Sequence, residues 1–175
     1  VDPPESWLFV HAGTLLDRPG QAPRSAATVV IRGERIVAVS DGYVQPAAHE
    51  GAPADAPVLD LRDHFVLPGL IDSHVHLDSD RAGVEGAMAA MTDNIATSAY
   101  EAAMNARKTL AAGFTTVRNL GNADGVTLAL RDAIAAGQMP GPRILDAGTS
   151  ISATAGHMDP TLGFRAELHD ALDRH

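Results

Sequence analysis

The sequence predicts an α/β protein in which a small β-sheet is followed by parallel strand–helix units. Residues 7–67 hold short apolar and β-branched runs separated by turn residues, which indicates a sheet of short strands. From Pro68 onward, strand patterns alternate with helical patterns, which implies parallel strands joined by crossover helices. We therefore expect two domains, formed by residues 1–66 and residues 67–175.

Tight turns are expected to link the strands of the first region. Arg32-Gly33-Glu34 is typical of a hairpin turn, and a second hairpin is expected around Arg62-Asp63. Residues 41–57 are rich in Gly, Pro, Ala and Asp, which predicts a surface loop. A sheet of this size needs a partner sheet to bury its inner face. The expected strands cover residues 7–13, 28–31, 35–39, 58–61 and 64–67.

About three strand–helix units are expected in the second region. Apolar residues at helical spacing predict a helix over residues 95–112, which ends at Gly113, and another over residues 124–136, which ends at Gly137. A long loop over residues 148–164 follows the third strand. The expected strands cover residues 70–77, 114–119 and 143–148, and residues 165–175 are expected to begin a further helix.

Length and composition limit the classes of function. The chain has 175 residues, enough for a hydrophobic core, but a complete (β/α)8 barrel takes about 250 residues. The balance of 22 acidic against 13 basic residues disfavours nucleic acid and anionic membranes as partners. No stretch approaches the ~20 apolar residues of a membrane span, and the absence of cysteine excludes thiol chemistry.

The chain begins at Val1 without a methionine or a signal-like apolar core, so we expect it to have been trimmed or processed. Export to the periplasm or the medium with signal cleavage is one explanation. A cytoplasmic enzyme from which only the front portion is present is the other.

The clearest functional signal is a pair of histidines at the end of an apolar strand. Side chains alternate along a strand, so His74 and His76 are expected to share one face with Asp72, while Ile71 and Val75 occupy the other. Two imidazoles so placed can bind one metal ion, and zinc accepts neutral imidazole where thiolate is absent. Small and acidic residues follow this strand, as at the carboxyl ends of barrel strands where sites are built.

The string V-L-P-G-L-I-D-S-H-V-H-L at residues 66–77 resembles the first barrel strand of the metal-dependent amidohydrolase superfamily. Residues 111–121 (A-A-G-F-T-T-V-R-N-L-G) and 155–160 (A-G-H-M-D-P) resemble its Xaa-Pro dipeptidase-like and carboxypeptidase-like branch, which includes ochratoxin-hydrolysing enzymes. The resemblance covers most of the chain. It implies a (β/α)8 TIM barrel, with the first three or so units present, after the N-terminal part of a small β-sandwich. Where the branch often has Asp and two Gly residues, this chain has Asn119, Ala155 and Met158.

The resemblance also implies an active site with two zinc ions bridged by a carboxylated lysine from the fourth barrel strand. Histidines from strands five and six complete the ligands, and an aspartate from strand eight is the general base. The single lysine of this chain, Lys108, lies within the predicted helix over residues 95–112 and is not expected to bridge metals. We therefore expect the bridging lysine and the general base beyond residue 175. His74 and His76 are the metal ligands expected here, and no catalytic residue is assigned within the chain.

Further candidates lie on the same predicted face. His157 is expected to hydrogen-bond the substrate carboxylate or the developing oxyanion, and Ser79 to contact substrate. Asp72 either supports the orientation of the metal ligands or is a buried carboxylate bonded to backbone donors. Arg118 or Asn119 is expected to line the pocket, with a structural ion pair as the alternative for Arg118. The histidines interpreted as surface or structural are His11, His49, His64, His169 and His175.

Three functions are compatible with these features. The leading one is a binuclear zinc amidohydrolase in which a metal-activated hydroxide cleaves small peptide-like amides, as a dipeptidase, carboxypeptidase or ochratoxinase does. A cyclic-amide hydrolase, similar to imidazolonepropionase or dihydroorotase, is the second, and the segment over residues 156–160 disfavours it. A catalytically incomplete fragment that acts only with the remainder of the same enzyme is the third, because a barrel opened after three units exposes strand edges. The resemblance implies a homo-oligomer.

Overall fold

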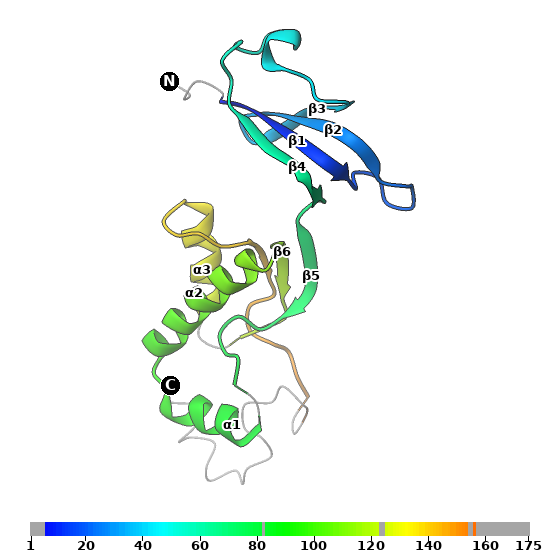
Figure 1. Cartoon of the computed structure of the whole chain (residues 1–175). Coiled ribbons are helices and arrows are strands. Elements are labelled where there is room, and N and C mark those ends of the chain that lie inside the picture. Colours follow the sequence, from blue (N-terminus) through cyan, green and yellow to red (C-terminus); the bar gives the residue numbers. More distant parts are fainter. Residues whose placement is uncertain (1–5, 82, 123–124, 154–155, 157–175) are drawn as a thin grey trace, which may run out of the picture. The chain divides into compact units, whose positions relative to one another are not determined.

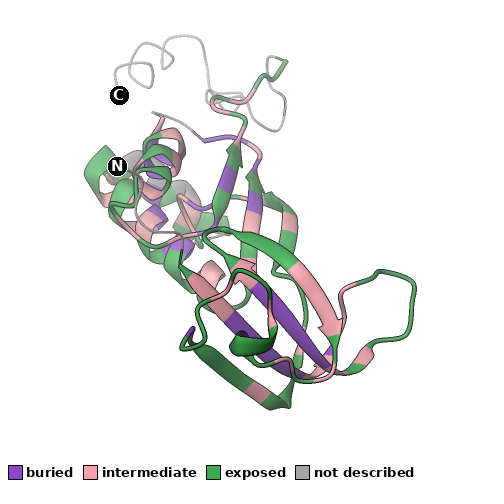
Figure 2. Ribbon diagram, turned by 90° about the horizontal axis from the view of Figure 1, so that it is seen from above, coloured by how far each residue is buried: buried purple, intermediate pink, exposed green. Residues whose placement is uncertain are grey.

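The computed structural model describes residues 6–81, 83–122, 125–153 and 156, and the chain divides into two compact units (Figure 1). The first unit is Val1–Pro68 and the second is Gly69–His175. This division lies two residues after the boundary expected from the sequence. Both units carry buried stretches on their strands, whereas loops and the outer sides of helices are largely exposed (Figure 2).

A four-stranded sheet in the order β3-β2-β1-β4 forms the first unit. β1 pairs antiparallel with β2, and β2 with β3, which confirms the hairpin predicted around Gly33. Buried residues lie on both faces of β1, because Val10 and Ala12 belong to one apolar cluster and Phe9 to another. The elements of this unit are β1 (Trp7–Leu15), β2 (Arg24–Arg32), β3 (Arg35–Asp41), η1 (Pro46–Ala48) and β4 (Val58–Val66).

The second hairpin, predicted around Arg62-Asp63, is wrong. β4 is one continuous strand that pairs parallel with β1, and its register shifts between Ala12 and Thr14. Two physical features favour this bulge over a turn. The carbonyl oxygen of Arg62 lies only 1.9 Å from where a Cβ on Gly13 would stand, so the approach requires glycine there. Asp60 accepts hydrogen bonds from the backbone and the guanidinium of Arg62, which lowers the pKa of Asp60 to about 2.

Three parallel strands in the order β5-β6-β7 form the sheet of the second unit, as predicted. Helices α2 and α3 pack on one face, where Ala102, Ala106 and Leu130 meet Val117 and Ile144 (Figure 1). Among the described residues, no helix has the length and apolar character needed to cross a membrane. The elements are β5 (Leu70–Val75), α1 (Gly83–Thr92), α2 (Ile95–Ala111), β6 (Phe114–Asn119), α3 (Val126–Ala135) and β7 (Arg143–Asp146).

Helix α1 was not predicted from the sequence. It is ten residues long and contains Gly83 and Gly86, and glycine lowers helix propensity by about 1 kcal/mol relative to alanine. Local preference therefore gives little signal for this helix. The predicted helix over residues 165–175 lies outside the described residues.

Helix α2 begins at a side-chain cap. The Asn94 side chain accepts a hydrogen bond of 3.1 Å from the backbone N–H of Thr97. We expect Asn94→Ala to lower the free energy of unfolding by about 1 kcal/mol, because that donor loses its partner. Urea denaturation followed by circular dichroism measures the change. Thr97→Ala keeps the backbone donor and is expected to stay within about 0.5 kcal/mol of wild type; equal stability of the Asn94 variant would contradict the cap's contribution.

Candidate metal centre

Strand β5 carries the histidine pair next to an irregularity in its pairing with β6. Asp72 pairs with Val117, and Val75 pairs with Asn119. Between these two pairs β5 advances by three residues and β6 by only two, so β5 contains one extra residue. Such a bulge shifts the alternation of side chains by one residue. Bulges re-aim side chains, and here the irregular part of the pairing, between Asp72 and Val75, includes His74 and ends one residue before His76.

The bulge corrects part of the predicted face. Paired residues of parallel strands point to the same side, so Asp72 shares the side of Val117, whereas Ile71 pairs with Thr116 and lies on the opposite, open side. Ile71 is accordingly 72% exposed. The prediction that Asp72 shares a face with the histidines and that Ile71 shares one with Val75 is therefore wrong, because the alternation is interrupted between them.

Two side chains form hydrogen bonds with backbone groups at the bulge. The Asp72 carboxylate accepts a hydrogen bond of 3.0 Å from the backbone N–H of His74. The guanidinium of Arg118, on β6, donates one of 2.8 Å to the carbonyl of Ser73. Asp72 thus accepts a hydrogen bond from the backbone of a predicted ligand, in an exposed contact and not as the buried carboxylate of the second alternative. Its influence on metal binding stays a prediction.

The two imidazoles lie close together and are both exposed. The ring centroids of His74 and His76 are 5.5 Å apart, and the ring planes meet at 66°. In a zinc site each ligand nitrogen lies ~2 Å from the metal. With the ring centre ~1 Å farther out, two imidazoles on one tetrahedral ion have centroids about 5 Å apart. The observed spacing therefore fits two imidazole ligands on one metal ion.

A backbone carbonyl orients the second imidazole. The Nδ1 of His76 lies 3.1 Å from the carbonyl oxygen of Gly121, which follows β6. A carbonyl can only accept, so Nδ1 carries the proton in this contact, and the lone pair is left on Nε2. This is the arrangement in which metal-bound histidines are usually held. Gly121 ends the segment over residues 111–121 that resembles the family branch, but its role as an acceptor for His76 depends on where the chain turns after β6.

Side-chain amides hold the residue after His76. The backbone N–H of Leu77 donates to Asn119 Oδ1 at 3.0 Å, and its carbonyl accepts from Asn105 Nδ2 at 3.0 Å. Asn119 Nδ2 donates in turn to the hydroxyl of Thr127 at 3.1 Å. All these groups are buried, Asn119 and Thr127 completely. Asn119 was predicted as a possible pocket residue; the structure shows it bonded within the protein interior.

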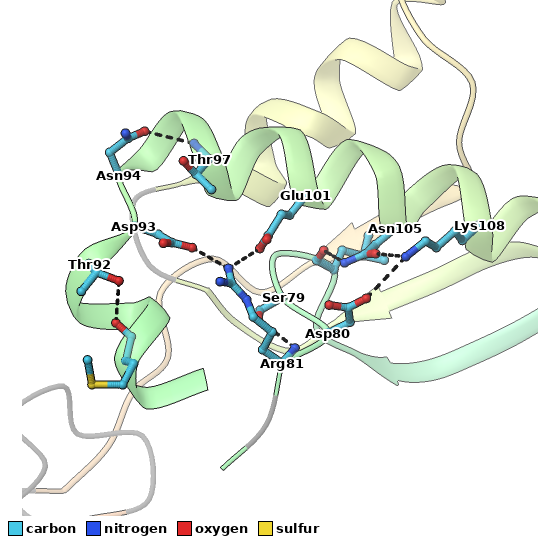
Figure 3. Close-up of polar contacts among 12 residues, drawn as sticks. Ser79, Asp80, Arg81, Thr92, Asp93, Asn94, Thr97, Glu101, Asn105 and Lys108 are labelled. Atoms are coloured by element: carbon cyan, nitrogen blue, oxygen red, sulfur yellow. Dashed lines mark hydrogen bonds and ion pairs between the residues drawn. The ribbon is translucent and has the colours of Figure 1, made fainter. Parts of the chain in front are cut away.

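The loop after β5 is tied to helix α2 by further polar contacts (Figure 3). Arg81 donates to both Asp93 and Glu101, and Lys108 lies 3.4 Å from a carboxylate oxygen of Asp80. The Ser79 hydroxyl accepts a hydrogen bond of 3.2 Å from the backbone N–H of Arg81. Ser79 is thus part of the loop's own structure, and its predicted contact with substrate stays a prediction.

Residues that sequence reasoning missed lie on one stripe of α2. Glu101, Asn105 and Lys108 are spaced at i, i+4 and i+7, which places them on the same side of a helix. All three contact the segment of residues 77–81. This spacing of polar residues in an Ala-rich helix is visible in the sequence, but only the fold shows which segment it faces.

One carboxyl next to the pair has an altered acidity. Asp78 is partly buried, and burial raises the pKa of its carboxyl above the ordinary value, although its own backbone N–H and the nearby His76 act in the opposite direction. Asp146, at the end of β7, contributes to the rise by charge repulsion. The end of β7 therefore brings an acidic group near Asp78, which lies two residues after His76.

The remaining histidines named in the sequence analysis are either outside the described residues or, where described, not part of a larger metal site. His157 lies outside the described residues. Within residues 6–81, 83–122, 125–153 and 156, no group of three or more His, Cys, Asp or Glu side chains is arranged to hold a metal ion. His11 is buried and bonded at 2.9 Å to the carbonyl of Val44, so it is structural. His49 packs edge-on against Trp7.

Known proteins with similar sequences include members of the amidohydrolase family. The profile of the amidohydrolase family matches residues 65–174. Ochratoxinase from Aspergillus niger is 30% identical over 158 residues, which cover 86% of this chain and 30% of that enzyme. A dihydroorotase from Anaeromyxobacter dehalogenans is 38% identical over 71 residues, or 40% of this chain and 14% of that enzyme.

A solved structure extends the similarity to the fold. A Xaa-Pro dipeptidase with methionine bound in its active site superposes with a TM-score of 0.77 and 35% identity, over 93% of this chain and 38% of that one. The chain thus spans about a third of the length of these relatives. Its strand–helix units form part of a (β/α)8 barrel, preceded by a small β-sheet. The chain belongs to the amidohydrolase family, because the family profile matches most of its second unit and because it shares the fold of these relatives.

Proposed function

We propose that this chain supplies the first metal-binding strand of a metal-dependent hydrolase that cleaves the amide C–N bond of small peptide-like substrates. The observation that carries the proposal is the histidine pair: two imidazoles from one strand, at the spacing of ligands on one ion, with Nδ1 of His76 engaged by a carbonyl. Water adds across the amide, so the products are a carboxylic acid and an amine.

We propose zinc as the metal, with two ions in the complete site, because imidazole and carboxylate ligands suit zinc when cysteine is absent. Bound metal supplies a Lewis acid that polarises the amide carbonyl and makes water acidic enough to attack at neutral pH. In this chain His74 and His76 bind, the Gly121 carbonyl keeps the His76 proton on Nδ1, and Asp72 holds the His74 backbone. The bridging lysine, the general base and the remaining ligands are proposed to come from outside the described residues.

The open face of the sheet supports a role for the remainder of the same enzyme as partner. Ile71 pairs with Thr116, and Leu145 with Arg118, so both lie on the face of β6 opposite Val117. They are 72% and 55% exposed. Apolar side chains grouped on one strand face are normally covered. We propose that further barrel strands cover them, that the complete protein is a homo-oligomer, and that the isolated chain hydrolyses nothing.

The substrate class is supported by the relatives. Ochratoxinase and Xaa-Pro dipeptidase match the chain over 86% and 93% of its length, which favours peptide-like amides with a terminal carboxylate. A cyclic-amide hydrolase is the second candidate, because the dihydroorotase is 38% identical, although over 40% of the chain only.

Hydrolysis assays on the complete enzyme that contains this chain test the proposal. We expect it to cleave a Xaa-Pro dipeptide or an N-acyl amino acid, to lose activity when a chelator removes metal, and to regain it with zinc. The isolated 175-residue chain is the matched control and is expected to be inactive. Metal-independent hydrolysis would contradict the proposal. Cleavage of dihydroorotate alone would favour the second candidate.

A further inference from the structure

Leu77, the residue that follows His76, has both backbone polar groups bound by side-chain amides from two different elements. Asn119 of β6 accepts from its N–H, and Asn105 of α2 donates to its carbonyl, each at 3.0 Å. We name Asn105 and Asn119 the amide clamp. The side chain of Leu77 is itself buried in the apolar cluster under α2 and α3. Backbone and side chain of this residue are therefore both fixed.

The orientation of each amide is defined by a second partner. Asn119 Oδ1 accepts from Leu77 while Nδ2 donates to the Thr127 hydroxyl. Asn105 Nδ2 donates to Leu77 while Oδ1 lies 3.4 Å from the Lys108 ammonium. A flipped Asn105 would lose both contacts, because a carbonyl can only accept and an ammonium can only donate. A flipped Asn119 would lose the contact with the Leu77 N–H, because an amide NH₂ group cannot accept from it. These residues are buried, where an unpaired polar group costs about 1–3 kcal/mol.

The amide clamp holds Leu77, which follows the proposed metal ligand His76 in the chain. Its two amides come from α2 and β6, and the carbonyl that accepts from His76 Nδ1 belongs to Gly121, two residues after Asn119. Asn119, at the end of β6, thus holds the residue after His76, and the acceptor for the His76 ring follows two residues later in the chain. We propose that Asn105 and Asn119 are positioning residues, which set the direction of the His76 ring and its Nδ1–H tautomer through Leu77. This inference rests on the proposed metal-binding function.

Helix α2 reinforces the same segment farther along. Glu101 pairs with Arg81, and Lys108 with Asp80, on the side of the helix that carries Asn105 (Figure 3). The Arg81 and Glu101 side chains are 24% exposed, whereas Lys108 and Asp80 are more than half exposed. Exposed ion pairs contribute little. Of these polar contacts of α2, only the buried one of Asn105 reaches Leu77 itself, the residue after His76.

Substitutions that remove each amide contact test the clamp. Asn105→Leu and Asn119→Leu keep the approximate size of the side chain but neither donate nor accept. Asn119→Asp retains an acceptor for the Leu77 N–H, and its second oxygen can accept from the Thr127 hydroxyl. Asn94→Ala is the matched control, because it removes the exposed cap bond at the start of α2 but no contact with Leu77.

The first measurement needs no metal. Nitrogen-15 NMR of the histidine rings reports which ring nitrogen carries the proton. In the wild-type chain we expect His76 to be mainly the Nδ1–H tautomer, and to lose this preference in Asn105→Leu and Asn119→Leu. Asn119→Asp and Asn94→Ala are expected to keep it. If Asn119→Leu does not fold, as judged by circular dichroism, Asn105→Leu and Asn119→Asp decide.

The second measurement is zinc affinity by calorimetry. We expect the two leucine variants to bind zinc ~10–100-fold more weakly, which is the usual effect of losing groups that orient a metal ligand, and the other two variants to stay within about threefold of wild type. Folded leucine variants with an unchanged tautomer and unchanged affinity would overturn the proposal. If His76→Ala leaves zinc binding intact, the metal-binding function fails, whereas a tautomer change in the leucine variants still supports positioning by the clamp.

Discussion

Replacing either histidine of the pair is expected to reduce the zinc affinity of this chain by at least about 100-fold. His74 and His76 bind as a chelate from one strand, and their rings are already 5.5 Å apart, so little reorganisation is needed when both bind. With His74→Ala or His76→Ala only one imidazole is left. Loss of groups that merely orient a ligand costs ~10–100-fold, so loss of the ligand itself costs more. Isothermal titration with zinc measures the effect.

His64→Ala is the matched control for these variants. His64 is exposed on β4, in the first unit, and its removal leaves β5 unchanged. We expect its zinc affinity to equal that of wild type. If all three alanine variants lose affinity equally, zinc binds the chain's histidines without selection and the site is not the one proposed. In the complete enzyme, the same two substitutions on β5 are expected to abolish hydrolysis.

Adding a methyl group at Gly121 is expected both to destabilise the second unit and to weaken zinc binding. Gly121 has a φ of 129°, which favours glycine, and a Cβ there would stand 2.1 Å from the Ser150 hydroxyl oxygen. Gly121→Ala is therefore expected to lower the free energy of unfolding by about 1–3 kcal/mol. Because the carbonyl of Gly121 accepts from His76, its displacement is expected to reduce zinc affinity by ~10-fold.

Gly137→Ala separates backbone strain from the effect on the site. Gly137 also has a positive φ, of 70°, but a Cβ there meets no atom within 4 Å, and it ends the turn after α3. We expect this variant to lose about 1 kcal/mol of stability with no change in zinc affinity. Urea denaturation and zinc titration of both variants measure the two effects. Wild-type zinc affinity in a folded Gly121→Ala protein would show that the carbonyl does not orient His76.

Local sequence signals predicted most of the second unit. Helix α2 ends at Ala111, one residue before the predicted end, and β6 covers Phe114–Asn119 as predicted, because the apolar spacing and the glycines act over short distances. The same kind of signal misled in the first unit. Two short strands around Arg62-Asp63 suggest a hairpin, but pairing with β1 across Gly13 stabilises one continuous strand, and a distant partner cannot be read from local spacing.

In the candidate site, too, a distant pairing partner changed what local spacing predicted. The alternation of side chains predicts one polar face for Asp72 and the histidines, yet the bulge in β5 moves Asp72 to the other face. The bulge is supported by Arg118, 45 positions away from Ser73 in the sequence. A register shift is a property of two paired strands, so the sequence of one strand does not contain it.

The amino-acid sequence alone determined the family, the parallel strand–helix order and the two imidazoles, because each depends on residues that are neighbours or near neighbours along the chain. Only the tertiary structure decided how those imidazoles are held. The Gly121 carbonyl, the amides of Asn105 and Asn119, and the stripe on α2 meet the end of β5 from separate elements. Their hydrogen bonds act over about 3 Å, and folding is what brings such distant residues within that range.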